Sequence, residues 1–483
     1  MKHYRLQRDI PVEEGYDLVV VGGGPAGSAA AICAARLGAK VLLVEATGCL
    51  GGMGTSGLVT AFDPMADGEK PLVGGIMREL VETLYERGEL GPQVTPDFWR
   101  RHYHRWTPFK AEGLKRLLDE RAAEAGVEVR LFTTLVDADA DADTVNGVVI
   151  HNIEGFRYVR ARAFVDCTGD AVLADLCGVQ CRTNPRFMPG TLCSLHTGID
   201  WDTASRRGIG VAGDNDDGAR TDIDWEKRRT QDQQTLLERA VADGQFSQPD
   251  RHLPGISRVG RTTGYLNAGH LFGLDALTCE GRSKGMALGR RLVEEYVDFY
   301  RAYADGFQNM ELVTTASLMG VRETRRIVGE YELAFDDYIA RRQFPDQIGV
   351  FNKFVDIHVR DCSEEEYERF RKEMSETGRL GPGECFGLPY GILVPRRWRN
   401  LWVAGRCNSS DVRVHGAIRV MPAAAMMGQA AGTAAVQAAE TDRPAFAIDT
   451  RRLVETLRRH GAYLPQDEVS QEPDPPGDPN TPG

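Results

Sequence analysis

A glycine-rich turn near the start of the chain has the residue types and spacing of a phosphate-binding site. Gly22, Gly24 and Gly27 follow the pattern Gly-x-Gly-x-x-Gly, with Pro25 and Ala26 between the last two glycines. In such turns the first glycine permits a tight bend and the second lets backbone approach a pyrophosphate, while the third lets a helix pack closely on a strand. Backbone N–H groups at the start of the following helix would face the phosphates. The turn therefore predicts a bound dinucleotide.

An acidic residue stands where such a site needs one. Glu45 ends the apolar stretch of residues 39–45, and Ala46 follows it as a further expected contact of the cofactor. A carboxylate at the end of the second strand can hold the ribose hydroxyls of an adenosine. The same charge disfavours a 2′-phosphate, so NADP is the dinucleotide that fits least. The pattern by itself does not separate FAD from NAD.

The elements that must position these residues form a β-α-β unit. Residues 16–21 are apolar and rich in Val, as in a buried parallel strand. A helix rich in Ala is expected over residues 28–37, and a second strand over residues 39–45. Strand, turn, helix, strand and acid thus occur in the order of a dinucleotide-binding α/β domain.

A second candidate cofactor segment lies far along the chain. Residues 400–405 have the pattern of a buried strand that ends in Ala-Gly, and residues 423–439 that of a helix of small residues. Pro422 suits the first turn of this helix. The positive end of the helix could stabilise negative charge on a flavin pyrimidine ring. An ordinary packing helix is the alternative interpretation of the same segment.

The two segments together give the chain a resemblance to a known group of proteins. Their pairing is similar to the two-part FAD site of glutathione-reductase-like flavoproteins. More closely, the chain resembles the FAD-dependent oxidoreductase family related to the fumarate reductase and succinate dehydrogenase flavoproteins. The blocks that carry the likeness span most of the chain and are residues 49–58, 165–170, 320–329, 388–395 and 400–439.

This resemblance implies an α/β fold with two domains. A glutathione-reductase-like, discontinuous Rossmann domain would bind FAD, and a mixed α+β domain would cover it and hold the substrate. The implied segments are a first FAD-binding part (1–181, with 62–110 as an optional insertion), a substrate or cap domain (182–399), a second FAD-binding part (400–464) and a disordered tail (465–483). The tail is rich in Pro and acidic residues, which is typical of disorder.

The resemblance also implies which other residues contact FAD. They are expected in the block after the acidic strand (Gly51, Gly52, Met53, Thr55, Ser56), beside the adenosine (Val136, Thr168, Gly169) and at the O2 edge of the flavin (Met421, Pro422, Ala423). Gly405 and Arg406 stand where relatives place an acidic residue against the ribityl chain. An arginine there departs from the wider pattern and puts a side-chain bond to the ribityl hydroxyls in doubt.

Most of the groups that could hold a substrate or move a proton lie in the same blocks, and His358 lies outside them in the sequence Asp356-Ile-His358. Related flavoproteins that act beside carboxylates use Arg and His for these tasks. The catalytic candidates of this chain are His415, Arg322, Arg419, His358 and Tyr390. Structural roles are the alternatives: an ion pair with Glu323 or Glu330 for Arg322 and its neighbour Arg325, and a backbone-satisfied ring for His415.

Composition argues against several other classes of protein. The 483 residues carry 58 basic and 70 acidic side chains, a net charge of −12 that does not suit a nucleic-acid binder. No run approaches the roughly 18 apolar residues of a membrane span, and the N-terminus lacks a secretory pattern. We therefore expect a cytoplasmic protein with no membrane partner.

Cysteine and histidine spacing predicts no metal site. The 10 cysteines include no Cys-x-x-Cys pair, which argues against a redox dithiol, a zinc ribbon or a cysteine-bound iron–sulfur cluster. His102 and His104 alternate within a polar stretch, and no third ligand is evident there.

The expected function is that of an FAD-dependent oxidoreductase of the dehydrogenase or reductase type, which transfers hydride between a small organic substrate and flavin N5. One alternative is a flavin monooxygenase fed by NAD(P)H, and another is a non-catalytic flavin- or nucleotide-binding scaffold. A single complete dinucleotide fingerprint argues against a separate nicotinamide domain. Transient binding of NAD(P)H or of a redox partner stays open, as does a homodimer.

Overall fold

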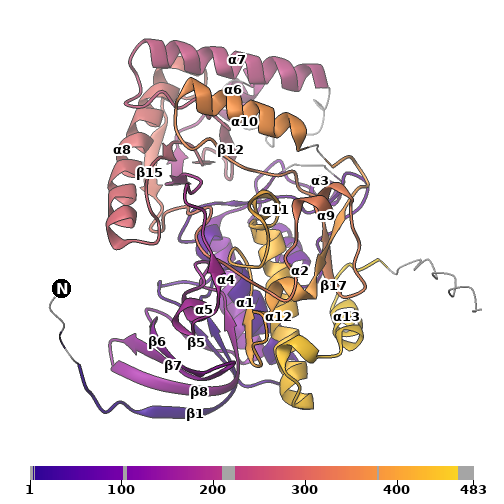
Figure 1. The fold of residues 1–483 in the computed structure, drawn as a ribbon. Helices are drawn as coiled ribbons and strands as arrows, with labels where there is room; N and C mark the ends of the chain where they lie inside the picture. Colours follow the sequence, from indigo (N-terminus) through magenta and orange to yellow (C-terminus); the bar gives the residue numbers. More distant parts are fainter. Residues whose placement is uncertain (1–3, 5, 102–105, 209–222, 378–379, 466–483) are drawn as a thin grey trace, which may run out of the picture.

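The computed structural model describes residues 4, 6–101, 106–208, 223–377 and 380–465. Apart from Pro465, the expected disordered tail lies outside the described residues, and so do His102 and His104. The described chain forms a lower body built around a sheet and an upper body of helices over a smaller sheet (Figure 1).

A parallel sheet forms the centre of the lower body. Its strands run in the order β5 (Glu128–Arg130), β2 (Val41–Val44), β1 (Val12–Val21), β8 (Gly155–Asp166) and β19 (Leu401–Val403). All four residues of β2 and all three of β19 are buried, as expected for apolar strands covered on both faces. The expected Rossmann-type α/β fold is confirmed.

A β-meander extends this sheet on one side. β6 (Thr134–Asp141) and β7 (Thr144–Asn152) run antiparallel to each other, and β7 pairs with residues 155–159 of β8. The other end of β8, residues 164–166, pairs with β19. One 12-residue strand therefore serves both the meander and the parallel sheet.

Two helices from distant parts of the chain pack directly against each other on the sheet. These are α1 (Pro25–Arg36) and α12 (Met421–Thr441). A Cβ added to Gly428 would lie 2.0 Å from the carbonyl oxygen of Ala26, and one added to Gly432 would lie 2.3 Å from that of Ala30. The backbones are in contact because these positions carry no side chain.

Further helices surround this pair. α4 (Ala111–Ala125) lies beside α1, while α2 (Gly75–Glu86) and α13 (Thr450–Arg459) lie beside α12. The N–H of Ile76 in α2 donates to Oε1 of Gln429 in α12 at 3.2 Å. Part of the expected insertion at residues 62–110 therefore packs in the lower body.

The upper body contains an antiparallel sheet and long helices (Figure 1). The sheet order is β12 (Ile256–Arg258), β13 (Gly264–Leu266), β11 (Ser194–Thr197) and β15 (Glu311–Thr315). The helices are α6 (Trp201–Arg207), α7 (Ile223–Ala242), α8 (Cys279–Tyr303) and α10 (Glu364–Glu376). Aromatic residues of α8 and the following turn fill its core, namely Tyr296, Phe299, Tyr300 and Phe307.

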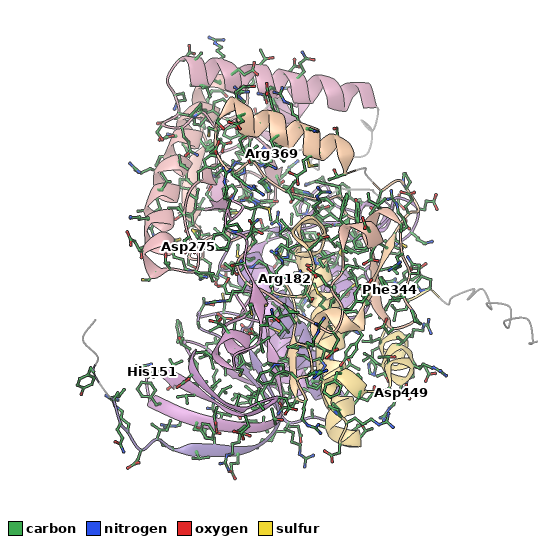
Figure 2. All side chains as sticks on the ribbon, in the orientation of Figure 1. His151, Arg182, Asp275, Phe344, Arg369 and Asp449 are labelled. Atoms are coloured by element: carbon green, nitrogen blue, oxygen red, sulfur yellow. The ribbon has the colours of Figure 1, made fainter. Side chains whose placement is uncertain are left out.

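Short elements join the two bodies. β9 (Cys181–Arg182) pairs with β16 (Arg326–Ile327), and Figure 2 shows Arg182 at the level where the bodies meet. β17 (Gln347–Phe351) and β18 (Phe386–Pro389) form an antiparallel pair whose Ile348 and Leu388 belong to the core under α12. Part of the segment expected as the cap thus packs in the lower body.

The remaining short elements are β3 (Ala61–Phe62), β4 (Thr107–Pro108), β10 (Gly190–Thr191), β14 (His270–Leu271), α3 (Pro96–Arg101), α5 (Val172–Leu176), α9 (Phe335–Ile339) and α11 (Val412–Ile418). Among the described helices, none combines the length and the apolar character needed to cross a membrane.

Candidate active site

The carboxyl ends of four parallel strands meet at one edge of the central sheet. β1, β2, β8 and β19 all point the same way, so the segments that follow Val21, Val44, Asp166 and Val403 come together. Ligands of open α/β sheets bind in the crevice outside such an edge. All but a few of the residues predicted to contact the cofactor follow one of these strands.

The glycine-rich turn between β1 and α1 has the backbone geometry that its sequence predicts. Gly22 has a φ of +97°, and a Cβ there would lie 2.5 Å from the carbonyl oxygen of Cys167. A Cβ on Gly27 would lie 1.7 Å from the carbonyl oxygen of Gly22. Of the three glycines of the pattern, Gly24 is the one that faces open space, because a Cβ there would meet no described atom within 4 Å. Gly24 precedes α1, and no side chain in the described part of the chain caps the N–H groups of that helix.

A second glycine segment lies against this turn. The Gly51 N–H donates to the Gly23 carbonyl at 2.8 Å, and a Cβ on Gly52 would lie 2.9 Å from the Cα of Gly24. A Cβ on Gly54 would lie 3.0 Å from Sδ of Met421, the first residue of α12. The short segment from Gly51 to Gly54 therefore touches the starts of both long helices.

The residues around this segment hold it in place. The buried Glu45 carboxylate accepts hydrogen bonds from the N–H groups of Gly23 (2.6 Å) and Thr47 (2.7 Å). Thr55 donates to the Leu50 carbonyl at 2.6 Å, and the Ser56 hydroxyl lies 3.2 Å from the Cys49 sulfur. Glu45 thus sits directly beside the glycine-rich turn, as predicted from its place after β2.

A buried carboxylate organises the segment after β8. The Asp170 side chain accepts hydrogen bonds from Arg406 (2.6 Å) and Thr324 (2.8 Å), and also from Arg282 of α8. Burial alone would raise the pKa of Asp170, but the two guanidinium groups outweigh it and hold that pKa below its ordinary value. Gly169, with a φ of +73°, packs against the Arg406 guanidinium.

The expected contacts at the adenosine end differ in their surroundings. Thr168 donates to the buried Asp166 carboxylate at 2.7 Å, so this turn is fixed. Val136 lies on β6 of the meander with 41% of its surface exposed, and Ala46 is exposed after β2. Arg406 is directed to Asp170, which leaves one of its terminal nitrogens buried and without a hydrogen-bond partner among the described residues.

Four of the five catalytic candidates gather near the start of α12. The His415 ring lies 3.2 Å from the Arg322 carbonyl, to which its Nε2–H donates. Arg419 donates to the Asp356 carboxylate at 3.2 Å, and His358 Nε2 lies 3.5 Å from the same carboxylate. Arg419 is two residues before Met421, so the cluster adjoins the positive end of α12, which no described side chain caps.

Arg322 is buried in this cluster without an ion pair to the predicted partners. Its guanidinium donates to the Pro189 carbonyl and to the Thr191 hydroxyl, each at 2.7 Å. Burial, together with the nearby charge of Arg419, lowers the pKa of Arg322 to about 10, so it stays protonated at neutral pH. Thr191 is paired with His270 in the β10–β14 ladder, which brings that histidine to the same place.

The alternative interpretation, in which Arg322 and Arg325 form ion pairs with Glu323 or Glu330, names the wrong partners. Arg325 pairs with Asp175 at 2.8 Å rather than with Glu323 or Glu330. Glu323 pairs instead with Arg326 at 3.3 Å. Glu330 accepts a hydrogen bond from the backbone N–H of Arg397. Arg325 therefore does have a structural ion pair, and Arg322 is left beside the histidines.

Tyr390 is not brought to the cluster. Its hydroxyl donates to the Ala445 carbonyl at 2.8 Å and accepts from the Trp402 indole at 2.7 Å. The side chain is 4% exposed in the core of the lower body. The Tyr390 hydroxyl therefore both donates and accepts a hydrogen bond inside the core, where its role is structural.

Burial keeps the histidines of the cluster neutral. Burial first, and the positive charges of Arg326 and Arg419 next, lower the pKa of His415 well below its ordinary value. Burial and then the charge of Arg322 do the same for His358. Because His415 donates through Nε2, its buried Nδ1 is an unprotonated acceptor, and it has no partner among the described residues.

Three residues that the sequence did not single out also belong to the site. His252, His270 and Asp250 lie against His358, with Nε2 of His270 2.9 Å from Nδ1 of His358. They come from the loop after α7 and from β14, far along the chain from His358. No local spacing links these segments, so only the folded cap brings them together.

The open space and the unpartnered groups fit an FAD molecule. The space before Gly24 suits a pyrophosphate at the start of α1, where N–H groups and the helix dipole favour anions. The start of α12 likewise presents N–H groups and the positive end of the helix dipole, which favour the O2 edge of a flavin ring. Arg406, Asn408, His415 and Arg419, in the chain segment that leads from β19 to α12, each have a buried polar atom with no hydrogen-bond partner among the described residues.

A family model matches nearly the whole chain. The family model described as FAD dependent oxidoreductase matches residues 17–457.

Curated relatives match shorter stretches. Digeranylgeranylglycerophospholipid reductase 2 of Methanothermobacter thermautotrophicus is 30% identical over 187 residues, which cover 37% of this chain and 45% of the relative. Dihydrolipoyl dehydrogenase of Trypanosoma brucei brucei is 56% identical over 47 residues, 10% of each chain. The matched stretch is thus less than half the length of either relative.

Among solved structures, a geranylgeranyl bacteriochlorophyll reductase-like protein from Thermoplasma acidophilum aligns over 93% of this chain and 83% of its own. The sequence identity is 12% and the TM-score is 0.43.

Proposed function

The chain belongs to the FAD dependent oxidoreductase family, and on that premise we propose that it uses FAD to oxidise or reduce a small organic substrate. When bound, FAD supplies hydride transfer at N5 of its flavin ring. The observation that carries the proposal is that the starts of α1 and α12, at Gly24 and Val420, both adjoin the Gly51–Gly54 segment, and that a buried cluster of arginine and histidine lies beside the start of α12.

The proposed cofactor contacts follow from backbone geometry and charge. N–H groups at the start of α1 bind the pyrophosphate in front of Gly24, and the Glu45 carboxylate binds the adenosine ribose. Gly51 and Gly52 let their segment pack directly against Thr55 and the glycine-rich turn, because a Cβ there would strike these neighbours, and this packing would hold the segment beside the ribityl chain. The start of α12 faces the flavin ring.

Asp170 is the proposed carboxylate on the ribityl side. Arg406 occupies the position where relatives carry an acidic residue, and this arginine holds the Asp170 carboxylate at 2.6 Å. The charges around Asp170 keep it ionised, so it can accept hydrogen bonds from hydroxyl groups. Asp170, which follows β8, would thus supply the carboxylate that Arg406 replaces at position 406.

The proposed substrate carries a carboxylate or carbonyl oxygen. Arg322 is charged and buried, and Nε of Arg419 is buried without a hydrogen-bond partner in the described part of the chain. Both guanidinium groups favour an anionic or strongly accepting oxygen. His415, with its free Nδ1, is the proposed proton acceptor for the reacting carbon or nitrogen.

An anaerobic visible titration of the purified protein with NADH and then NADPH tests the reaction. We expect a flavin spectrum that neither nucleotide bleaches, because the substrate itself reduces or reoxidises the flavin. Rapid bleaching by either nucleotide would favour the NAD(P)H-fed monooxygenase. A protein with no flavin band would overturn the cofactor placement.

The variant Gly24→Val tests where FAD binds. The backbone at this position has a φ of −67°, which valine tolerates, and the side chain would enter the open space before α1. We expect a folded protein that has lost most of its flavin. Gly381→Val is the matched control, since its Cβ also has room (nearest atom 3.7 Å), and it should keep the flavin. Full flavin content in Gly24→Val would refute the placement.

A further inference from the structure

Three buried or half-buried histidines meet where the upper body contacts the lower body. They are His252, His270 and His358, and one ring nitrogen of each lies within 4.8 Å of the others. The His252 and His270 rings stack at 4.7 Å between centroids, and the His358 ring stands nearly perpendicular to both. The three residues come from three separate segments, so their meeting is a product of the fold.

Carboxylates orient two of the rings. Asp250 lies 3.2 Å from Nδ1 of His270 and also accepts the backbone N–H groups of His252 and His270. Asp356 lies 3.5 Å from Nε2 of His358 and is itself held by Arg419. Each carboxylate occupies the outer nitrogen, so Nε2 of His270 and Nδ1 of His358 face each other at 2.9 Å.

We propose that His252, His270 and His358 bind a divalent transition-metal ion of the zinc class. Three imidazole ligands with an open fourth position are typical of catalytic zinc sites. Nitrogen ligands on a tetrahedral ion at about 2.0–2.1 Å lie roughly 3.3 Å apart, so only small movements separate the present arrangement from coordination. Carboxylates on the outer nitrogens are the usual supports of metal-bound histidine.

The surrounding charges also suit a cation. The Asp250 and Asp356 carboxylates lie beside the rings and offset a double positive charge. The positive groups nearby are Arg322, which is hydrogen-bonded to Thr191 and Pro189, and Arg419, which is paired with Asp356. The open position of the ion would take an oxygen or nitrogen of a substrate or a water molecule. This site goes beyond the proposed flavin chemistry and does not depend on it.

Metal titration of the flavin-containing protein tests the proposal. The protein, free of any affinity tag and stripped with EDTA, is titrated with Zn²⁺ by calorimetry and with Co²⁺ by visible absorption at wavelengths beyond the flavin bands. We expect one ion per chain and the absorption of tetrahedral Co²⁺. His270→Gln and His358→Gln should each weaken Zn²⁺ binding at least about 100-fold, and Asp250→Asn about 10–100-fold.

Controls separate this site from other histidines and from misfolding. His151→Gln removes an exposed histidine on β7 of the meander, labelled in Figure 2, and should leave Zn²⁺ binding unchanged. His252→Gln changes the half-buried member of the cluster and keeps the test valid where the buried variants do not fold. Absence of Zn²⁺ binding, or equal affinity in the folded cluster variants and the parent, would overturn the proposal. Flavin content is measured in parallel, so failure here is distinct from failure of the flavin assignment.

Discussion

The Asp170 carboxylate joins segments from both bodies through hydrogen bonds to Arg406, Arg282 and Thr324. Replacing it with asparagine would leave two guanidinium groups without their shared counter-charge. Removing one partner of a buried ion pair costs about 3–5 kcal/mol, and partial exposure of Arg282 reduces the cost at its end of the network. We expect Asp170→Asn to lower the thermal unfolding midpoint clearly and to reduce flavin content.

The control for this prediction is an exposed ion pair. Glu440 and Arg452 are each about half exposed, so Glu440→Gln should change stability by no more than about 0.5 kcal/mol. Calorimetric scans of the parent and both variants make the comparison. Equal midpoints for Asp170→Asn and Glu440→Gln would show that the buried network around Asp170 stabilises the fold no more than an exposed ion pair does.

His196 gives the protein a residue-level sensitivity to acid. It is fully buried on β11, its Nδ1 has no partner among the described residues, and burial lowers its pKa to about 4. The unfolded chain, with a histidine pKa of 6.5, binds the proton more readily. Stability from this group is therefore present above pH 6.5 and is lost as the pH falls toward about 4. By about pH 5 the loss is about 2 kcal/mol.

The variant His196→Gln removes this titration. We expect its thermal midpoint to fall less than that of the parent when the pH is lowered from about 7 to about 5, although its stability at neutral pH is reduced. Parallel pH dependences in the two proteins would contradict the assignment.

At the scale of elements, the contact between α1 and α12 determines the distance between the two candidate cofactor ends. Gly428 and Gly432 allow backbone contact because any Cβ would lie 2.0–2.3 Å from a carbonyl oxygen of α1. Gly428→Ala should force the helices apart, destabilise the protein by about 1–3 kcal/mol and lower flavin content. Thermal scans and flavin absorbance measure both effects.

The matched control is Gly381→Ala, where the added methyl group meets no atom closer than 3.7 Å. It should leave the midpoint nearly unchanged and the flavin content intact. A Gly428→Ala protein as stable as this control would mean that the two helices can separate without cost.

The sequence predicted these elements well where their pattern was local. α1 begins at Pro25 rather than residue 28, because proline occupies the first helical turn without loss of a needed N–H. α12 begins at Met421, with Pro422 likewise in its first turn. β2 and β19 lie within their predicted ranges, and β1 extends its predicted range toward the N-terminus. These strands could be predicted because continuous apolar runs are typical of strands covered on both faces.

At the scale of the whole molecule, the proposed cofactor site spans the chain from Gly22 to Ala423. A ligand that binds the folded state alone adds stability that grows with its concentration over Kd, about 3–4 kcal/mol at roughly 100–1,000 times Kd. We expect removal of FAD to lower the thermal midpoint of the whole chain and added FAD to restore it. A thermal midpoint that does not change when FAD is removed or added would show that the segments assemble independently of the cofactor.

The sequence by itself determined the nucleotide-binding unit, because glycine spacing, apolar strands and the terminal carboxylate are local properties of one β-α-β segment. It also indicated Arg322, Arg419 and His415 through their blocks and His358 as a separate candidate, and the structure brings these four together. Tyr390 belonged to a similar block, yet its hydroxyl is used inside the core.

Only the tertiary structure decided the partners of these groups. Asp170 meets Arg406 because β8 and β19 are neighbours in the sheet, although they lie far apart along the chain. His252 and His270 meet His358 because the cap folds three segments onto one place, and no spacing in the sequence encodes that contact. Burial then sets their protonation, since desolvation depends on how the two bodies close around the histidines rather than on neighbouring residues.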